Sequence, residues 1–349
     1  RLRPQSRLSL FREGSPSDSK VLWKAHAVVQ RIAAGVVSAP IEEAQGEFDA
    51  AALVSVCLRW NAVPFVREQT ALRLFAVDEY CIHPDLAQAI LGARPLVVSP
   101  SRVIDPVDVG AVCTAAGLKP DASQLAVIRN VLRSRLSLVQ GPPGTGKSTV
   151  IGVVAECFTK RGNGQVLACG ASNIAVDRVA KQCCEAGVAC LRLLSLDRET
   201  GTTVPERATL EYHIGRLRGP LAASYREFHA LRTANNGVLH RRHRARYEEL
   251  QRELEFEVIR TVAVVCCACA TAGGERLRGL RFAHVIIDEA TQSVEPQTLI
   301  PCVRGAGFLV LGGDQCPLGP VVESRAAAAA GLQVSMFERL VLGGHPVFP

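Results

Sequence analysis

The sequence predicts an α/β protein in which a parallel, doubly wound sheet carries a phosphate-binding loop. A small β domain precedes this sheet, and a helical hairpin is inserted into it. Three observations support this prediction. A glycine-rich loop with Lys147 and Ser148 stands between an apolar strand and a helix. From residue 121 onward, strand-like runs alternate with helical ones, which is the order of a helix-covered parallel sheet. Between residues 197 and 260 the pattern is helical throughout.

The first part of the chain predicts a small β domain behind a short arm. Residues 1–20 are rich in Arg, Ser and Pro, and we expect a disordered arm there. From residue 21 to 99, short β-type runs are broken by Gly and Pro, which is typical of a small barrel or sandwich. Trp23 and Trp60 fit its core better than a base-stacking role. A linker rich in Pro, Asp and Val is expected at residues 100–120.

Residues 121–349 predict the sheet domain. Its first helix is amphipathic and follows Asp121 and Ser123, either of which suits a helix cap. We expect strands at residues 136–140, 165–169, 188–194, 261–267, 283–288 and 308–312, and helices at 148–160, 173–186 and 334–342.

Residues 197–260 predict a helical hairpin inserted into the sheet domain. Apolar residues recur at helical spacing on both sides of an Asn-Asn-Gly turn at residues 235–237. The run H-R-R-H-R-A-R at residues 240–246 is the most basic part of the chain. A solvated helix face and a phosphate-contacting face explain it equally well.

The glycine-rich loop has the spacing G-x-x-x-x-G-K-S, formed by Gly141, Gly146, Lys147 and Ser148. Glycines let successive backbone N–H groups point at one phosphate chain, and the following helix adds the positive end of its dipole. Lysine at this position binds the outer phosphates, and the serine hydroxyl suits Mg²⁺. A simple strand-to-helix turn seldom requires Lys-Ser at this offset, so the loop predicts a nucleoside triphosphate site.

Two further polar clusters follow apolar strands. Asp288 and Glu289 come directly after V-I-I, and Asp314 with Gln315 follows L-V-L-G-G. Side chains that leave the carboxyl ends of parallel strands line the ligand crevice of such sheets. An aspartate there can hold Mg²⁺, and a glutamate can activate the attacking water. These residues therefore predict the catalytic half of the phosphate site.

The composition excludes some classes of protein. With 48% hydrophobic and 21% charged residues, the chain is typical of soluble globular proteins. It has no apolar run of membrane-spanning length and no evident signal peptide. The formal charge of +7 mildly favours a polyanionic partner. Because the first residue is Arg1 rather than Met, we expect a fragment or a processed chain.

The thirteen cysteines do not form a convincing metal or disulfide pattern. Cys266 and Cys269 have C-x-x-C spacing, but they lie in an apolar stretch that predicts a buried strand. No second ligand pair follows at the spacing of a zinc site. We therefore expect buried, reduced thiols in an intracellular protein.

At these motifs the chain resembles superfamily 1 helicases of the up-frameshift type, which act in nonsense-mediated mRNA decay. The similar stretches are S-L-V-Q-G-P-P-G-T-G-K-S, G-A-S-N-I-A-V-D, V-V-C-C-A-C, V-I-I-D-E-A-T-Q and G-D-Q-C-P-L-G-P-V-V. They occur in the family's order, and the resemblance as a whole covers about residues 21 to 342. The resemblance implies a RecA-like ATPase domain at residues 121–349, with the helical insertion at 197–260, preceded by a β-barrel domain at 21–99.

The resemblance also implies a role for each matching residue. Asp288 is similar to the family's magnesium aspartate, Glu289 to its catalytic glutamate and Gln292 to a γ-phosphate sensor, while Gln124 is similar to its adenine-reading glutamine. The remaining nucleotide contacts are implied for Gly141, Pro142, Pro143, Gly144, Thr145, Gly146, Lys147, Ser148, Thr149, Asp314 and Gln315. Contacts to a single nucleic-acid strand are implied for Ser172, Asn173, Cys269, Ala270 and Thr271.

The implied cofactors are ATP and Mg²⁺, and the implied activity is ATP-dependent unwinding of RNA or DNA in the cytoplasm. Single-stranded nucleic acid, a second motor domain and mRNA-decay factors are the implied partners, with no membrane involved.

The chain departs from the family pattern at three places. Ala171 stands where the family has Pro, and Pro317 stands where it has a γ-phosphate-sensing Gln. The second RecA-like domain, which carries the arginine fingers, is absent from the sequence, so we expect slow ATP turnover without unwinding. A degenerate, non-catalytic nucleic-acid-binding paralogue is the alternative. A GTPase is disfavoured because the sequence has no N-K-x-D motif.

Overall fold

The computed structural model describes the backbone of residues 7–13, 21–28, 31–33, 36–38, 41–45 and 55–59. It describes residues 62–92, 107–142, 144–162, 164–194, 204–235, 238–314 and 319–349 together with their side chains, except that of Arg241. The chain divides into two units, Arg1–Val66 and Arg67–Pro349.

The smaller unit contains a four-stranded antiparallel sheet in the order β5-β2-β1-β6 and a separate hairpin, β3-β4. In the backbone described here, no pairing joins β5 to β6, so the structure supports a sheet and leaves the predicted barrel unconfirmed. The strands are β1 (Arg7–Glu13), β2 (Val21–Val28), β3 (Arg31–Ala33), β4 (Val36–Ser38), β5 (Ile41–Gln45) and β6 (Ser55–Arg59).

Strand β1 corrects the prediction of a disordered arm at residues 1–20. It pairs with both β2 and β6 and so lies inside the sheet. The sequence of β1, R-L-S-L-F-R-E, carries Leu8 and Leu10 at the two-residue spacing of a half-buried strand. The strand has only seven residues, and the Arg, Ser and Pro residues on either side of it make the composition of residues 1–20 resemble that of a disordered segment.

The boundary between the units lies earlier than predicted. Helices α1 (Val63–Val77) and α2 (Pro84–Ile90) fall within the range assigned to the β domain. Yet Ala71, Leu86 and Ile90 are buried in the same apolar core as the strands of the larger unit. The larger unit therefore begins near residue 67, whereas the predicted β domain ends at residue 99 and the predicted sheet domain begins at residue 121.

Part of the predicted linker at residues 100–120 is also helical. Helix α3 (Val109–Ala115) is capped by Asp108, whose side chain accepts from the Ala111 N–H at 3.0 Å. Val112 and Cys113 are buried in the core that also contains α4 and α5. The linker prediction is therefore wrong for these residues, because seven residues are too few for helical periodicity to stand out against Pro and Asp.

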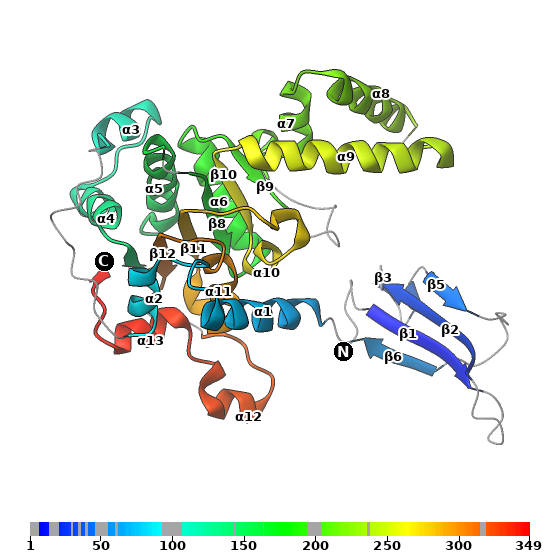
Figure 1. Ribbon diagram of the computed structural model, residues 1–349, viewed down its shortest axis with the longest axis horizontal. Helices are drawn as coiled ribbons and strands as arrows, with labels where there is room; N and C mark the ends of the chain where they lie inside the picture. The colour runs from blue at the N-terminus through cyan, green and yellow to red at the C-terminus, as the bar shows by residue number, and fades with distance from the viewer. Residues whose placement is uncertain are drawn as a thin grey trace. The chain divides into compact units, whose positions relative to one another are not determined.

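The larger unit is built on a seven-stranded sheet in the order β13-β7-β12-β11-β8-β10-β9 (Figure 1). All its strand pairs are parallel, which confirms the predicted sheet type. The strands are β7 (Leu136–Gln140), β8 (Val166–Gly170), β9 (Cys190–Arg192), β10 (Val264–Ala268), β11 (His284–Asp288), β12 (Phe308–Gly313) and β13 (Val347–Phe348).

Helices cover both faces of this sheet. Alternate residues of each central strand enter different cores: in β11, Val285 and Ile287 belong to one core and Ile286 to the other. This two-faced burial explains why the strands read as continuous apolar runs. Besides α1, α2 and α3, the helices outside the insertion are α4 (Ala122–Arg133), α5 (Lys147–Lys160), α6 (Asn173–Glu185), α10 (Cys269–Ala272), α11 (Glu295–Cys302), α12 (Arg325–Ala327) and α13 (Met336–Leu342).

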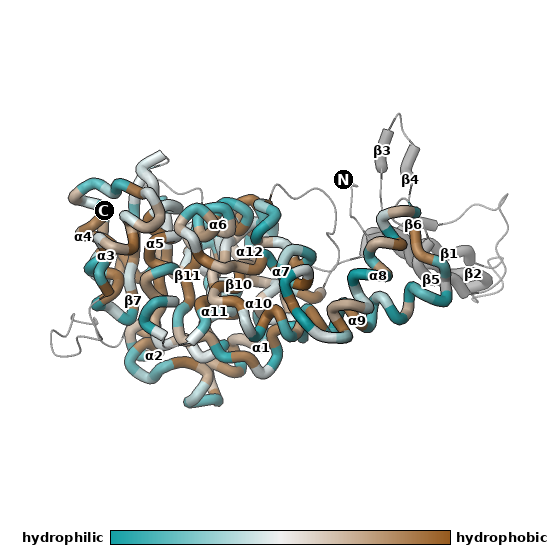
Figure 2. The backbone as a smooth tube through the Cα atoms, turned by 90° about the horizontal axis from the view of Figure 1, so that it is seen from above, coloured by the Kyte–Doolittle hydropathy of each residue, from teal (hydrophilic) through white to brown (hydrophobic). Residues whose placement is uncertain are grey.

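The predicted helical hairpin is confirmed. It consists of α7 (Leu210–Arg216), α8 (Pro220–Ala234) and α9 (Arg241–Thr261), and apolar and polar residues alternate along α8 and α9 (Figure 2). The rings of Tyr225 and Tyr247 stack between α8 and α9, with their hydroxyl oxygens 3.1 Å apart. Within the basic run, Arg244 and Arg246 form ion pairs with acids on the next turn of α9.

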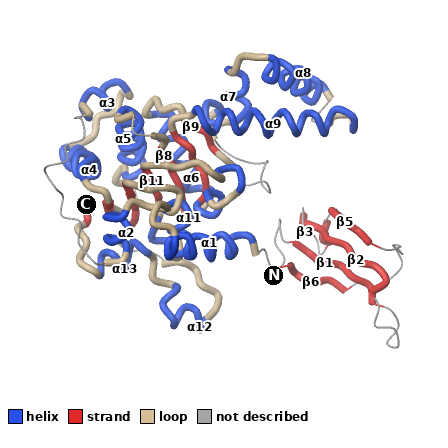
Figure 3. The backbone as a smooth tube through the Cα atoms, viewed as in Figure 1, coloured by secondary structure: helices blue, strands red, loops and turns tan. Residues whose placement is uncertain are grey.

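The cysteines whose side chains the structure describes are free thiols and, apart from Cys184, they are buried. In the described residues no cluster of three or more His, Cys, Asp or Glu side chains could hold a metal ion. None of the helices shown in Figure 3 is both long and apolar enough to cross a membrane, within the part of the chain that the structure describes.

Candidate active site

The glycine-rich loop connects β7 to the first turn of α5. Gly144 and Gly146 have φ values of 86° and 83°, in the left-handed region that favours glycine. A Cβ atom on Gly146 would also lie 2.7 Å from Nε2 of Gln124, so any other residue here would displace that side chain. The loop thus requires glycine here, and it leads into the N-terminus of a 14-residue helix, an arrangement that suits phosphate.

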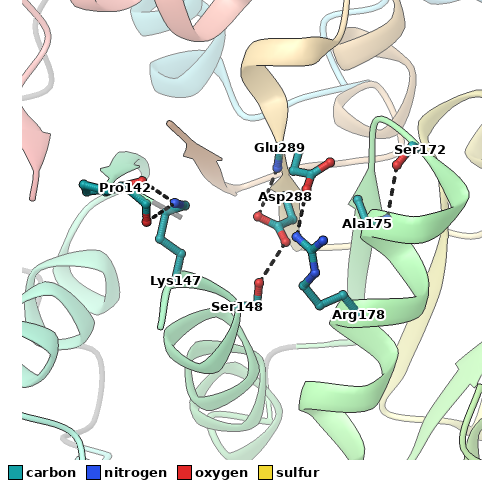
Figure 4. Close-up of polar contacts among 9 residues, drawn as sticks. Pro142, Lys147, Ser148, Ser172, Ala175, Arg178, Asp288 and Glu289 are labelled. Carbon is teal, nitrogen blue, oxygen red and sulfur yellow. Dashed lines mark hydrogen bonds and ion pairs between the residues drawn. The ribbon is translucent and has the colours of Figure 1, made fainter. Parts of the chain in front are cut away.

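Lys147 begins α5 and folds back over the loop (Figure 4). Its Nζ donates to the carbonyl oxygens of Gly141 and Pro142, at 2.9 Å for Pro142. The ammonium group is therefore held at the entrance of the loop by neutral acceptors. Phosphate oxygens are stronger acceptors for a cation than these carbonyls, so the arrangement fits an anionic ligand.

Ser148 and Asp288 form the part of the site that fits Mg²⁺. The Ser148 hydroxyl donates to Oδ2 of Asp288 over 3.3 Å. Asp288 ends β11 and is 2% exposed, and burial together with the neighbouring Glu289 charge raises its pKa. A buried, poorly compensated carboxylate beside a hydroxyl is a hard oxygen site, which is the chemistry that Mg²⁺ prefers.

Glu289 follows in an unusual backbone conformation. Its φ of 54° makes it the one non-glycine residue with positive φ in the described part of the chain. Its N–H donates to Oδ1 of Asp288 at 3.0 Å. Its carboxylate contacts Arg178 of α6, with 2.8 Å between Oε1 and Nη1. Strained residues of this kind concentrate at functional sites.

These groups surround one cavity of about 420 Å³. The loop after β7 and the ends of β11 and β12 contribute to it, as expected for neighbouring parallel strands. Of the residues predicted from the sequence, the structure brings these together around the cavity: Gly144, Gly146, Lys147, Ser148, Thr149, Asp288, Glu289, Gln292 and Asp314.

A second cavity of about 230 Å³ lies on the other side of Lys147 and is lined by Gln124, Gly141, Pro142 and Thr145. Oε1 of Gln124 accepts from the N–H of Asp121, and this contact completes the capping box of α4. Its Nε2 donates to the Thr145 carbonyl oxygen at 3.0 Å. Gln124 therefore joins α4 to the phosphate loop, next to the space expected for a base.

The residues predicted to contact a nucleic-acid strand lie elsewhere. Ser172 caps α6, and Asn173 accepts from Nη2 of Arg192 at 3.1 Å. Cys269 and Thr271 are 0% and 8% exposed, so their side chains face the core, and the backbone of α10 and the half-buried Ala270 side chain remain for contact. The carbonyl oxygen of Ala270 accepts from Nη1 of Arg67.

Residues 172–173 and residues 269–271 are nevertheless neighbours. Helices α6 and α10 follow adjacent strands whose last residues, Gly170 and Ala268, are paired. Pro143, Gln315 and Pro317 lie outside the described residues.

Arg178 lines the larger cavity but was not predicted from the sequence. It stands in the middle of α6, where an arginine is usually a solvated surface residue. Its contact with Glu289 depends on how α6 packs beside β11, and no local sequence pattern encodes that packing.

The sequence profile of the AAA domain family matches residues 119–236 and 229–325, which include the glycine-rich loop and both acidic clusters. The chain belongs to the AAA domain family.

Similar curated proteins agree with the resemblance to the up-frameshift type. This AAA domain chain is 38% identical to the regulator of nonsense transcripts 1 homolog of Arabidopsis thaliana over 84% of its length and 23% of that protein. It is 37% identical to regulator of nonsense transcripts 1 of Caenorhabditis elegans, over 84% of this chain and 27% of that one. It is 36% identical to the ATP-dependent helicase NAM7 of Saccharomyces cerevisiae, over 82% of this chain and 28% of that protein.

The chain thus spans about a quarter of the length of these relatives. Among solved structures, the UvsW helicase of bacteriophage T4 has a TM-score of 0.34 and 11% identity over 74% of this chain and 88% of that one, which is too distant to support an argument.

Proposed function

We propose that this chain is the ATP-binding and single-strand-binding half of an ATP-dependent helicase of the up-frameshift type, acting in nonsense-mediated mRNA decay. One observation carries the proposal: Lys147, Ser148, Asp288 and Glu289, which come from two separate segments, line one cavity. The names of the similar proteins support the choice of a helicase over other phosphate-loop enzymes.

The chain's own residues divide the hydrolysis of ATP among them. Lys147 binds the outer phosphate oxygens, while Ser148 and Asp288 would hold Mg²⁺. When bound, Mg²⁺ neutralises the charge that develops on the transferred phosphoryl group. Glu289 accepts a proton from water as the water oxygen bonds to the γ-phosphorus. The bond from the γ-phosphorus to the bridging oxygen breaks, and its electron pair leaves with ADP.

The strand-binding part of the proposal rests on α6 and α10. Ser172, Asn173 and the backbone of residues 269–271 follow two adjacent strands on the same edge of the sheet as the nucleotide cavity. We propose single-stranded RNA as the ligand, a second motor domain and mRNA-decay factors as partners, and the cytoplasm as the location. The arginine fingers of a second motor domain typically raise phosphoryl-transfer rates by about 10³–10⁵-fold, so we expect such a partner domain to accelerate hydrolysis at this site.

Nucleotide binding and single-turnover hydrolysis test the proposal. We expect fluorescent mant-ATP with Mg²⁺ to bind the wild-type chain. Lys147→Ala should weaken this binding by roughly 10-fold or more, because a charge-assisted phosphate contact is lost. Glu289→Gln retains binding but lowers the single-turnover rate by about 10²-fold or more.

An equal hydrolysis rate for Glu289→Gln and wild type would contradict the enzyme and support a non-catalytic nucleic-acid-binding paralogue. Competition between RNA and DNA oligonucleotides of the same sequence identifies the strand, with tighter RNA binding expected.

A further inference from the structure

Arg178 brings a second cation to the nucleotide cavity, from a different element than Lys147. Its Nη1 lies 2.8 Å from Oε1 of Glu289. In Figure 4 the guanidinium of Arg178 points from α6 toward the end of β11, where Asp288 and Glu289 emerge. Among the described residues, Arg178 is the hydrogen-bond partner of the Glu289 carboxylate and occupies one oxygen of the two.

This ion pair contributes little to folding stability. The side chains of Arg178 and Glu289 are 48% and 23% exposed. Ion pairs with this much solvent contact are screened and must restrict two flexible side chains. The position of Arg178 therefore calls for another explanation than stabilisation of the fold.

The segment of α6 that carries Arg178 is fixed in place by contacts of its neighbouring residues. Next to it in sequence, Asp177 accepts from Nε of Arg192 at 2.6 Å, and Arg192 on β9 is 4% exposed. Buried charge-assisted hydrogen bonds of this kind fix the elements that they join. The Ser172 cap fixes the start of the same helix. Arg178 thus approaches the cavity from a helix whose position is set by contacts behind it.

The Glu289 backbone is likewise fixed, by its left-handed conformation and its hydrogen bond to Asp288. Its carboxylate still has three side-chain torsions between it and this backbone. A general base must present an ionised oxygen to water in a defined direction. A guanidinium on one oxygen fixes the direction of the carboxylate and leaves the other oxygen available to accept a proton.

We propose that Arg178 is a positioning residue for Glu289: by holding Oε1, it orients the carboxylate so that Oε2 receives the proton of the attacking water. The assignment rests on the proposed hydrolysis of ATP. It predicts an effect on the rate of hydrolysis rather than on the binding of nucleotide.

The test compares Arg178→Ala, Arg178→Lys and a matched control, Lys181→Ala. Lys181 lies three residues further along α6, is 60% exposed and pairs with Glu185, away from the cavity. For each variant, the dissociation constant for mant-ATP with Mg²⁺, the single-turnover hydrolysis rate and the melting temperature are measured. Arg178→Ala lowers the rate by roughly 10–100-fold, the range for a misplaced catalytic group, and leaves the dissociation constant within about twofold.

Two further results separate positioning from a merely structural role. Arg178→Lys recovers part of the rate, because it keeps the charge but loses the planar fork. In the Glu289→Gln background, Arg178→Ala has no additional effect, since the group that it orients is already gone. The melting temperature of Arg178→Ala stays at the wild-type value. Lys181→Ala keeps the wild-type dissociation constant, hydrolysis rate and melting temperature.

A wild-type rate for Arg178→Ala would overturn the assignment and leave the proposed function standing. Weaker mant-ATP binding in proportion to the loss of rate would also overturn it, in favour of direct contact between Arg178 and phosphate. A wild-type chain that binds no mant-ATP would instead overturn the proposed function, and the assignment with it.

Discussion

At the scale of single residues, His284 is a buried titratable group outside the active site. Its ring stacks on Phe158, with centroids 4.3 Å apart, and on Phe308 at 5.3 Å. Within the described residues, neither of its ring nitrogens has a hydrogen-bond partner. Burial, and then the nearby positive charge of Arg161, lower its pKa to about 4. His284 is therefore neutral in the folded protein at physiological pH.

This pKa makes the folded protein acid-sensitive. Between pH 6.5 and 4 the unfolded chain binds a proton on His284 that the folded chain does not, so the free energy of unfolding falls as pH falls through this window. The full effect is about 3 kcal/mol. His284→Phe removes it, and urea unfolding at pH 7.5 and 4.5 measures the difference. As a control, substitution of the exposed His243 by Gln should leave the pH dependence of the free energy of unfolding as in the wild type. An equal change in that free energy between pH 7.5 and 4.5 for wild type and His284→Phe would contradict the prediction.

Residue-scale sequence patterns predicted most of the candidate site. Lys147, Ser148, Asp288 and Glu289 were found because the phosphate loop has fixed spacing and because acids after apolar strands converge at one edge of a parallel sheet. Arg178 was missed because its role depends on packing between α6 and β11, far apart in sequence.

At the scale of elements, α4 connects directly to the phosphate loop. Asp121 and Gln124 satisfy each other's backbone N–H groups in a capping box, and Gln124 also donates to Thr145 in the loop. The start of this helix and the shape of the loop therefore depend on the same side chain.

Substitution of Asp121 should affect both. Asp121→Ala removes the acceptor for the Gln124 N–H and destabilises the protein by about 1 kcal/mol, the usual effect of losing a helix cap. Because Gln124 is then less restrained, mant-ATP binding should weaken by up to about 5-fold, the factor that corresponds to 1 kcal/mol. Asp121→Asn keeps an acceptor and serves as the control. Unchanged binding in Asp121→Ala would show that the loop keeps its shape without the cap.

At the scale of the whole molecule, the sequence predicted the sheet better than the limits of the units. Six of the seven strands of the larger unit coincide with predicted apolar runs. Strand β13 was not predicted, because two residues are too few to show a pattern. Helices α1, α2 and α3 were assigned to the β domain and the linker because they precede the first sheet strand in sequence. What decides their membership is the long-range burial of Ala71, Leu86 and Val112 in the cores of the sheet unit.

Two truncated chains test this division. A chain of residues 63–349 retains α1 and α2 and should unfold cooperatively and bind mant-ATP as the full chain does. A chain of residues 107–349 lacks the buried side chains of Leu86 and Ile90, each worth roughly 1.5–3 kcal/mol of apolar burial, and should melt at a lower temperature or aggregate. Equal melting temperatures for the two chains would mean that α1 and α2 add nothing to the larger unit.

The left-handed backbone conformation of Glu289 implies a trade-off between catalytic activity and thermal stability at this position. Glycine fits this conformation without the steric cost of about 1–2 kcal/mol that an L-residue with a side chain carries there. Glu289→Gly should therefore be more stable than Glu289→Gln by about 1 kcal/mol, as measured by urea unfolding, although both lack the carboxylate. A library selected for survival of heating alone would accumulate glycine at this position and become inactive, so activity has to be included in any selection for thermostable variants.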